Sequence, residues 1–108
     1  MELSMGALQA YLLDHYGGRA NEQGLFMKLV EEIGEVAEVL NRRTGRKAAD
    51  GLDFADALGK ELADVIHYTV AIAAVNGLDL NEMILQKDKA AAVKYRHDVD
   101  LETFLSRR

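Results

Sequence analysis

The residues that decide the fold run from Leu62 to Val75 and read LADVIHYTVAIAAV. Apart from Asp64 and His67, most side chains in this stretch are apolar or small, and they fall on all sides of the helix that the pattern predicts. Helices of this kind lie buried between other helices or against a second subunit. The stretch therefore predicts a helical protein in which this segment is central.

Two acidic motifs accompany this helix: Glu61-x-x-Asp64 at its start, and Glu31-Glu32-x-x-Glu35 upstream. Carboxylates three or four positions apart share one side of a helix. If the two motifs face each other, pairs of charges ~6 Å apart cost roughly 3 kcal/mol each at an effective dielectric near 20. Mg²⁺ or Mn²⁺ would compensate this crowding more fully than protons at neutral pH. The motifs predict a metal site; a solvated helix face is the alternative for the first motif.

Asp64 lies inside the apolar stretch, where an unpaired buried charge costs several kcal/mol. The structural alternative to a metal is an ion pair or hydrogen bond with Lys28, Lys60 or His67. Asp64-x-x-His67 is also similar to the Glu-x-x-His pairs of di-iron bundles, which need two such pairs. The chain has no second pair, so we expect His67 to pack or to support a metal ligand.

Capping signals and apolar spacing predict four helices with short connections. The first covers residues 3–16, with Ser4 as its N-cap and a stop at Gly17-Gly18. After a loop over 19–24, the second helix places an apolar series on one face: Phe26, Leu29, Val30, Ile33, Ala37 and Leu40.

The second half of the chain begins with a basic loop, predicted over 41–53. The third helix starts near 53–56 and ends at Val75, before Asn76-Gly77. The fourth opens at the capping box Asp79-Leu80-Asn81-Glu82 and runs to about Arg96. A short final turn is expected around Leu101, Phe104 and Leu105.

These elements predict an all-α fold, a four-helix bundle-type domain spanning residues 1–108. The third helix is too apolar for one small bundle to cover. We therefore expect helices to pair across a homo-oligomer, a homodimer or a homotetramer.

Composition narrows the function classes. The formal net charge is -5, which argues against a sequence-independent nucleic-acid binder. The absence of cysteine excludes disulfides, thiolate ligands and a thiol nucleophile. No basic leader followed by a long apolar run occurs, so a cytoplasmic protein without membrane contact is expected.

The fourth helix is basic. Lys87 and Lys94 are two turns apart and share a side, whereas Lys89 lies elsewhere on the helix. Lysines late in a helix complement its dipole, and this is the expected role of Lys89. For Lys87 and Lys94 the alternative is phosphate binding beside a metal.

In this order and spacing, the motifs resemble the MazG-like nucleotide pyrophosphohydrolases of the all-α NTP pyrophosphatase superfamily. The matching segments are KLVEEIGEVAE (28–38), KELADVIHY (60–68), GLDL (77–80), Lys87 and Lys94-Tyr95. The family's fourth helix often carries an asparagine where this chain has Ala91.

The resemblance implies Mg²⁺-dependent hydrolysis of a nucleoside triphosphate between its α and β phosphates, giving a monophosphate and pyrophosphate; Mn²⁺ is a possible substitute. Glu31 and Glu35 are the expected water-activating residues, and Glu31 and Glu38 could hold a further ion. The implied metal ligands are Glu32, Glu35, Glu61 and Asp64, and the implied substrate contacts are Lys28, Lys87, Lys94 and Tyr95.

Three other functions remain open from the sequence. Phosphoribosyl-ATP pyrophosphohydrolase of histidine biosynthesis is similar in size, helical character and acidic motifs, with a different substrate. A non-catalytic helical interaction module would use the acidic face to bind a basic partner. A di-iron oxidase is disfavoured by the ligand types.

Overall fold

The computed structural model describes residues 1–18, 21–44 and 51–108, and within these ranges the chain forms five helices and no strand. None of the described helices is long and apolar enough to cross a membrane. The all-α prediction is confirmed. The helices are α1 (Met5–Tyr16), α2 (Glu22–Thr44), α3 (Gly51–Val75), α4 (Leu80–Lys94) and α5 (Leu101–Ser106).

The predicted caps are present. The Ser4 side chain accepts a hydrogen bond from the Ala7 amide at the start of α1, and α3 ends at Val75 as expected. Gly77 follows with φ 67°, a left-handed conformation that favours glycine. Asp79 accepts from the Glu82 amide and opens α4.

Helix α2 extends at both ends into the stretches predicted as loops. Asn21 accepts hydrogen bonds from the amides of Gln23 and Gly24 and so caps a helix that begins within the predicted 19–24 loop. At the other end, α2 continues past Leu40 into the predicted basic loop.

The third helix likewise starts earlier than expected, at Gly51. Residues 45–50 of the predicted basic loop lie outside the described residues. The fourth helix ends at Lys94, two residues before the predicted end, and Arg96 has a positive φ of 57°.

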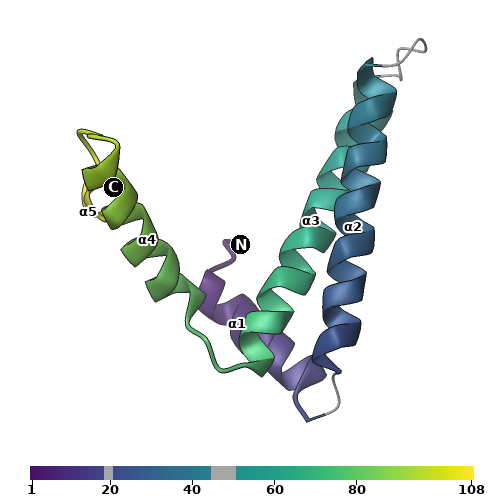
Figure 1. Cartoon of the computed structure of the whole chain (residues 1–108), viewed down its shortest axis with the longest axis horizontal. Coiled ribbons are helices and arrows are strands. Elements are labelled where there is room, and N and C mark those ends of the chain that lie inside the picture. The colour runs from purple at the N-terminus through teal and green to yellow at the C-terminus, as the bar shows by residue number, and fades with distance from the viewer. Residues whose placement is uncertain (19–20, 45–50) are drawn as a thin grey trace.

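The body of the molecule is the antiparallel pair α2–α3, with α1 packed against the C-terminal half of α3 (Figure 1). Alanine side chains on α3 let α1 approach closely. The buried cluster at the junction of the three helices consists of Leu12, Leu25, Val70, Ala71 and Ala74.

The face of α2 that packs in this chain differs from the apolar series read from the sequence. Of that series, Leu29 is half-buried, while Phe26, Val30, Ile33 and Leu40 are exposed. The most covered positions of α2 instead form a neighbouring stripe that lies along α3: Leu25, Leu29, Glu32, Val36 and Val39.

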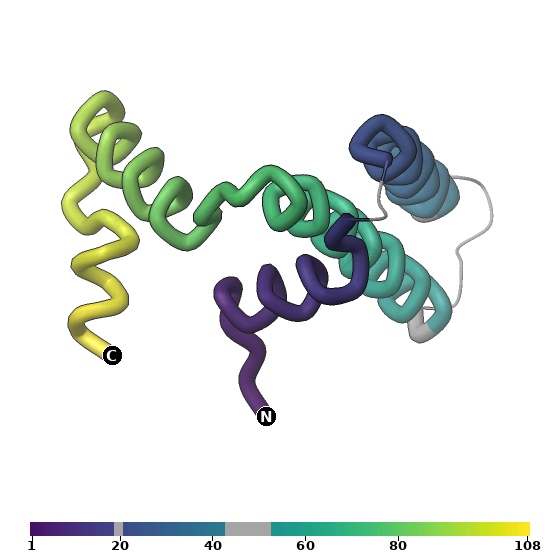
Figure 2. The backbone as a smooth tube through the Cα atoms, turned by 90° about the horizontal axis from the view of Figure 1, so that it is seen from below, coloured from purple at the N-terminus to yellow at the C-terminus, as the bar shows by residue number. Residues whose placement is uncertain are grey.

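Helices α4 and α5 form an arm that diverges from the α2–α3 pair (Figures 1 and 2). The Gln9 side chain fixes its direction, since it donates to the carbonyl of Leu78 at 2.5 Å and accepts from the amide of Leu80 at 2.8 Å. The radius of gyration is 16.9 Å, whereas about 13 Å is usual for a compact domain of this length. Within one chain, the four predicted helices therefore do not close into a bundle.

Candidate metal centre

Three carboxylates from two helices meet on the α2–α3 pair. Glu32 on α2 and Glu61 and Asp64 on α3 each offer an oxygen, and these oxygens lie within 4.8 Å of one another. The meeting follows from helix geometry, because Glu32 occupies the α2 stripe that packs along α3 and Glu61 is half-buried on α3 opposite it. The two sequence motifs thus converge as predicted.

Burial is distributed differently from the prediction. Glu32 is the buried carboxylate, 7% exposed, and Glu61 is half-buried, whereas Asp64 is exposed. The Oε2 atoms of Glu32 and Glu61 are buried without a hydrogen-bond partner. Such atoms are costly unless something pairs with them. The carboxylates that require a partner are therefore those of Glu32 and Glu61, and not that of the exposed Asp64.

The electrostatics of the cluster are those of crowded like charges. Hydrogen bonding to Glu35, then burial, then the neighbouring Glu32 raise the pKa of Glu61 to about 7. Burial is the main cause that raises the pKa of Glu32. A raised pKa means that the ionised form lacks compensation. At neutral pH the Glu61 carboxyl of the metal-free cluster is therefore protonated about half of the time.

Nearby cations are engaged elsewhere. Lys28 pairs with Glu31 at 3.3 Å, and Lys60 pairs with Asp56 at 2.9 Å. His67, the third partner expected for Asp64 beside Lys28 and Lys60, bonds to the Tyr16 hydroxyl. Among the described residues, none of these three side chains therefore pairs with Asp64. The described chain supplies no counter-ion inside the cluster.

This arrangement fits a divalent cation. All the candidate ligand atoms are carboxylate oxygens, the type that Mg²⁺ and Mn²⁺ prefer. Two of these oxygens are buried without a hydrogen-bond partner. Zinc sites are usually built with histidine or cysteine ligands, and His67 turns its Nε2 to Tyr16 at 2.7 Å. The cluster could therefore hold a hard cation.

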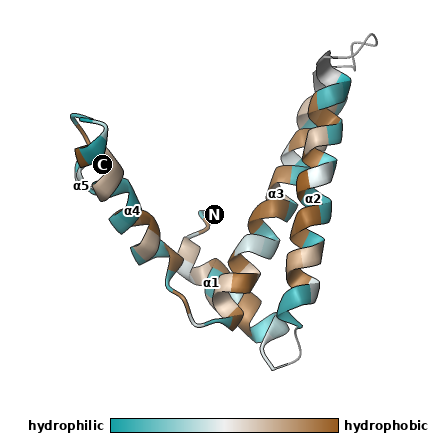
Figure 3. Cartoon of the chain, viewed as in Figure 1, coloured by the Kyte–Doolittle hydropathy of each residue, from teal (hydrophilic) through white to brown (hydrophobic). Residues whose placement is uncertain are grey.

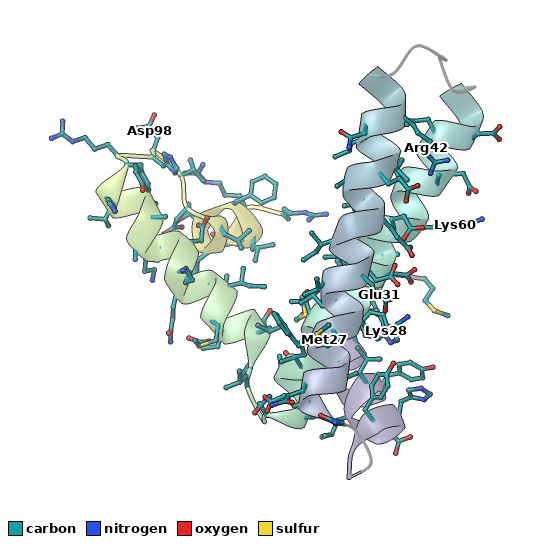
Figure 4. All side chains as sticks on the ribbon, turned by 45° about the vertical axis from the view of Figure 1, so that its right-hand side comes forward. Met27, Lys28, Glu31, Arg42, Lys60 and Asp98 are labelled. Carbon is teal, nitrogen blue, oxygen red and sulfur yellow. The ribbon has the colours of Figure 1, made fainter. Side chains whose placement is uncertain are left out.

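The two residues expected to activate water differ in position. Glu35, one turn after Glu32, is close enough to be the largest cause of the shifted pKa of Glu61. Glu31 lies on the outer side, where Lys28 holds it (Figure 4). Glu38 is exposed a further turn along α2.

The predicted substrate contacts fall into two groups. Lys28 is near the cluster, and its Nζ lies 5.9 Å from the centroid of the Tyr68 ring. Lys87, Lys94 and Tyr95 are on or just after α4, on the arm, and this chain does not bring them to the carboxylates.

Sequence reasoning missed one contact beside the cluster. The Tyr16 hydroxyl at the end of α1 meets Nε2 of His67 on α3, and the two rings pack edge to face. Burial is the main cause that raises the pKa of Tyr16. The two residues are 51 positions apart, so no local spacing could have predicted the contact.

A separate cavity of about 350 Å³ lies at the end of α4, far along the arm. Its charged lining mixes both signs, with Lys89 and Arg96 beside Asp98 and Asp100. Lys89 is already paired with Glu102 at 2.6 Å. The carboxylate cluster, in contrast, lies on the α2–α3 pair and contains only acidic groups.

Comparisons with known proteins agree with this geometry. A search of curated proteins found no match. Among solved structures, the chain is similar to iMazG from Vibrio DAT 722 in its Ntag-iMazG form, with 29% sequence identity and a TM-score of 0.65 over 86% of this chain and 98% of that one. The family model of the MazG nucleotide pyrophosphohydrolase domain matches residues 20–95, which include both acidic motifs. The chain belongs to this family and is a nucleotide pyrophosphohydrolase, a hydrolase rather than a non-catalytic interaction module.

Proposed function

We propose that this enzyme hydrolyses a nucleoside triphosphate between the α and β phosphates in the presence of Mg²⁺, releasing a nucleoside monophosphate and pyrophosphate. The convergence of Glu32, Glu61 and Asp64 within 4.8 Å is the observation that supports this most strongly. A triphosphate carries magnesium in water, and an all-carboxylate site accepts the same ion. The domain performing this reaction spans residues 1–108.

The metal ligands we assign are Glu32, Glu35, Glu61 and Asp64. Mg²⁺ held there would lower the pKa of water and offset charge on the phosphates. Binding it requires Glu61 to release the proton that its neighbours make it retain. Mn²⁺ has similar ligand preferences and is expected to substitute.

Water is the nucleophile in this proposal, because the site contains no serine, cysteine or histidine arrangement suited to a covalent intermediate. Glu31 or Glu35 orients the water and accepts its proton. Glu35 has the better position, next to Glu61. Glu31 is held by Lys28 in an ion pair at 3.3 Å, on the outer side of the cluster.

Phosphate contacts come from cations in this proposal. Lys28 lies beside the cluster on the same face as Glu31. An ammonium group there would balance charge on the leaving pyrophosphate. Lys87, Lys94 and Tyr95 are the remaining assigned contacts.

A nucleotide panel tests the proposed reaction. Purified protein is incubated with ordinary and modified triphosphates, diphosphates and phosphoribosyl-ATP, with Mg²⁺ or with chelator, and products are separated. The expected products are monophosphate and pyrophosphate, formed only with the metal. Release of inorganic phosphate instead would refute the assigned bond. Turnover of phosphoribosyl-ATP alone would replace the substrate with that of the histidine-pathway enzyme.

We also propose that the enzyme is at least a homodimer. Phe26 and Ile33 on α2 and Ile66 on α3 are each more than half exposed, and hydrophobic colour follows both helices (Figure 3). Apolar surface of this extent is typical of a subunit interface. Analytical ultracentrifugation at micromolar concentration should give a dimer or tetramer, and a clean monomer would contradict the proposal.

A further inference from the structure

One polar side chain lies within the packed face of α1. The other members of this face belong to the buried cluster or pack against it: Met5, Leu8, Leu12 and Tyr16. Gln9 is four residues after Met5 and three before Leu12, so it shares their face, and it is half-buried there. A side-chain amide in such a position needs hydrogen-bond partners. Apolar packing alone does not supply them.

The partners of Gln9 are backbone groups of the connection between α3 and α4. The amide nitrogen of Gln9 donates to the carbonyl of Leu78 at 2.5 Å, and its oxygen accepts from the amide of Leu80 at 2.8 Å. Leu80 is the first residue of α4, and its amide has no partner within the helix. One bond would allow the connection to turn about it, whereas two bonds on either side of Asp79 restrict that rotation. Gln9 therefore fixes the direction in which α4 leaves the connection.

The arm has little other support. Helix α4 packs on α1 and on α5, and α5 belongs to the arm itself (Figures 1 and 2). Leu80 packs against the buried cluster, but Met83 is 48% exposed and Val93 is 79% exposed. The described arm is therefore held to the rest of the chain mainly at its first turn.

An arm that is held at one end amplifies small rotations. Lys87 and Lys94 follow Leu80 by seven and fourteen residues, which is about 10 and 21 Å along the helix. A rotation of about 10° at Leu80 would move these positions by roughly 2 and 4 Å. Charge-assisted hydrogen bonds require donor–acceptor distances of about 2.7–2.9 Å, so displacements of this size break them. The positions of both lysines depend on the direction that Gln9 fixes.

We propose that Gln9 is a positioning residue for substrate binding: its two hydrogen bonds hold α4 at the angle at which Lys87 and Lys94 meet the phosphates. This inference rests on the proposed function, which assigns both lysines as substrate contacts. Gln9 is not a member of the carboxylate cluster. Its loss should therefore weaken binding of the phosphates and leave binding of the metal ion unchanged.

A double-mutant cycle tests the proposal. Gln9→Met keeps the length of the side chain and removes both hydrogen bonds, and it should lower kcat/KM for the triphosphate about tenfold, mainly through KM. In the variant Lys87→Ala with Lys94→Ala, the same change should lower kcat/KM by less than about twofold, because the lysines through which Gln9 acts are absent. Equal losses in both backgrounds would overturn the proposal, since a purely structural contact affects both alike. Wild-type activity of the lysine variant would also overturn it.

Gln86→Met is the matched control. Gln86 is a glutamine of α4 whose side chain bonds within the helix, to Glu82 at 3.1 Å, and its replacement should leave kcat/KM unchanged. Calorimetric titration with Mg²⁺ should give the wild-type affinity in Gln9→Met. Loss of Mg²⁺ binding in that variant would contradict a role confined to α4.

Further outcomes separate this inference from the proposed function. A wild-type protein that hydrolyses no triphosphate would refute the proposed function, whereas an active wild type with an unaffected Gln9→Met would overturn only the role of Gln9. If thermal melts show that Gln9→Met is unfolded, Gln9→Glu takes its place in the cycle. Glutamate keeps the acceptor for the Leu80 amide and loses the donor to the Leu78 carbonyl.

A distance measurement reports the direction of the arm independently of activity. The chain has no cysteine, so Gln23→Cys on α2 and Val93→Cys on α4 place one spin label on each helix, at exposed positions. Co-expression with an excess of cysteine-free protein leaves one labelled chain in each assembly. The distances between the labels should have a narrow distribution with Gln9 present and a broader or shifted one in Gln9→Met. An unchanged distribution would overturn the claim that Gln9 sets the direction of α4.

Discussion

Two regions of this chain, the α4–α5 arm and the α2–α3 pair, contain carboxylates in opposite environments. On the arm, Asp88 accepts from the Leu101 amide at 2.6 Å, and Asp100 accepts from the Thr103 amide at 2.8 Å. Hydrogen bonds from Thr103 lower the pKa of Asp100. On the α2–α3 pair, Glu61 meets other carboxylates and its pKa rises to about 7.

The difference separates structural carboxylates from a binding site. A carboxylate whose charge is satisfied by backbone amides caps a helix and needs nothing further. A cluster whose charges are unsatisfied raises the free energy of the fold, and this cost is removed when a cation binds. Four predictions test this contrast, from the largest expected effect to the smallest.

The largest effect should come from the cluster itself. Glu61→Gln is expected to lower turnover by at least about 100-fold, since removal of groups that only support a metal ligand already costs 10- to 100-fold. Asp56→Asn is the matched control, because Asp56 is an exposed carboxylate of the same helix that pairs with Lys60. Steady-state kinetics with saturating Mg²⁺ measure turnover in both variants. Equal losses of turnover would contradict the distinction between the carboxylates of the cluster and an ordinary exposed carboxylate.

Metal binding should stabilise the fold, more at high pH. At roughly a hundred times its dissociation constant, Mg²⁺ adds about 2.7 kcal/mol to the free energy of unfolding. The proton on Glu61 competes with the metal, so the thermal shift should be larger one pH unit above its pKa of about 7 than one unit below. Melting curves with Mg²⁺ or chelator at both pH values measure it. A shift independent of pH would argue against Glu61 as a ligand.

Without metal, the pH dependence of stability should have a definite sign. The Glu61 carboxyl titrates near 4.5 when unfolded and at about 7 when folded, so between these values the folded state holds the extra proton. Its contribution is present below pH 4.5 and is lost as the pH rises through 7. Denaturant titrations in chelator should show this decline, and Glu61→Gln should flatten it. Stability that rises across the window in wild type alone would contradict the assignment.

The smallest effect should come from the arm. Asp100→Ala removes the N-cap of α5, which should lower the melting temperature by less than Mg²⁺ raises it, while turnover is unchanged. Because the pKa of Asp100 is lowered from 3.8, its contribution is present above that pH and is lost on further acidification. A large loss of activity in this variant would mean that the arm's carboxylates are functional too.

Interactions between residues close in the sequence allowed several helix ends to be predicted. The caps at Ser4 and Asp79 and the stop at Gly77 depend on neighbouring residues only, and capping rules reach that far. Part of the carboxylate cluster was predictable for a related reason. Each acidic motif spans one helical turn, so its carboxylates lie on one side of their own helix. The start of α2 was missed because the hydrogen bonds of Asn21 were read as loop chemistry.

Other features depend on how helices pack in three dimensions. Sequence predicted that Asp64 would be buried, and Glu32 is buried instead, because the stripe of α2 that faces α3 is set by tertiary contacts. The direction of α4 follows from hydrogen bonds of Gln9, 69 and 71 positions away in the sequence. Such distant contacts leave no signal in apolar spacing, and for this reason the position of Lys87 relative to the cluster could not be predicted.

The most direct test of the account is calorimetric titration of metal-free protein with Mg²⁺, in the absence of nucleotide, for wild type, Glu61→Gln and Asp56→Asn. The carboxylates of the α2–α3 pair should bind the ion in wild type and in Asp56→Asn, with protons released near pH 7. Binding should be lost or strongly weakened in Glu61→Gln. Equal Mg²⁺ binding by all three proteins, without proton release, would contradict the claim that this cluster is the metal site.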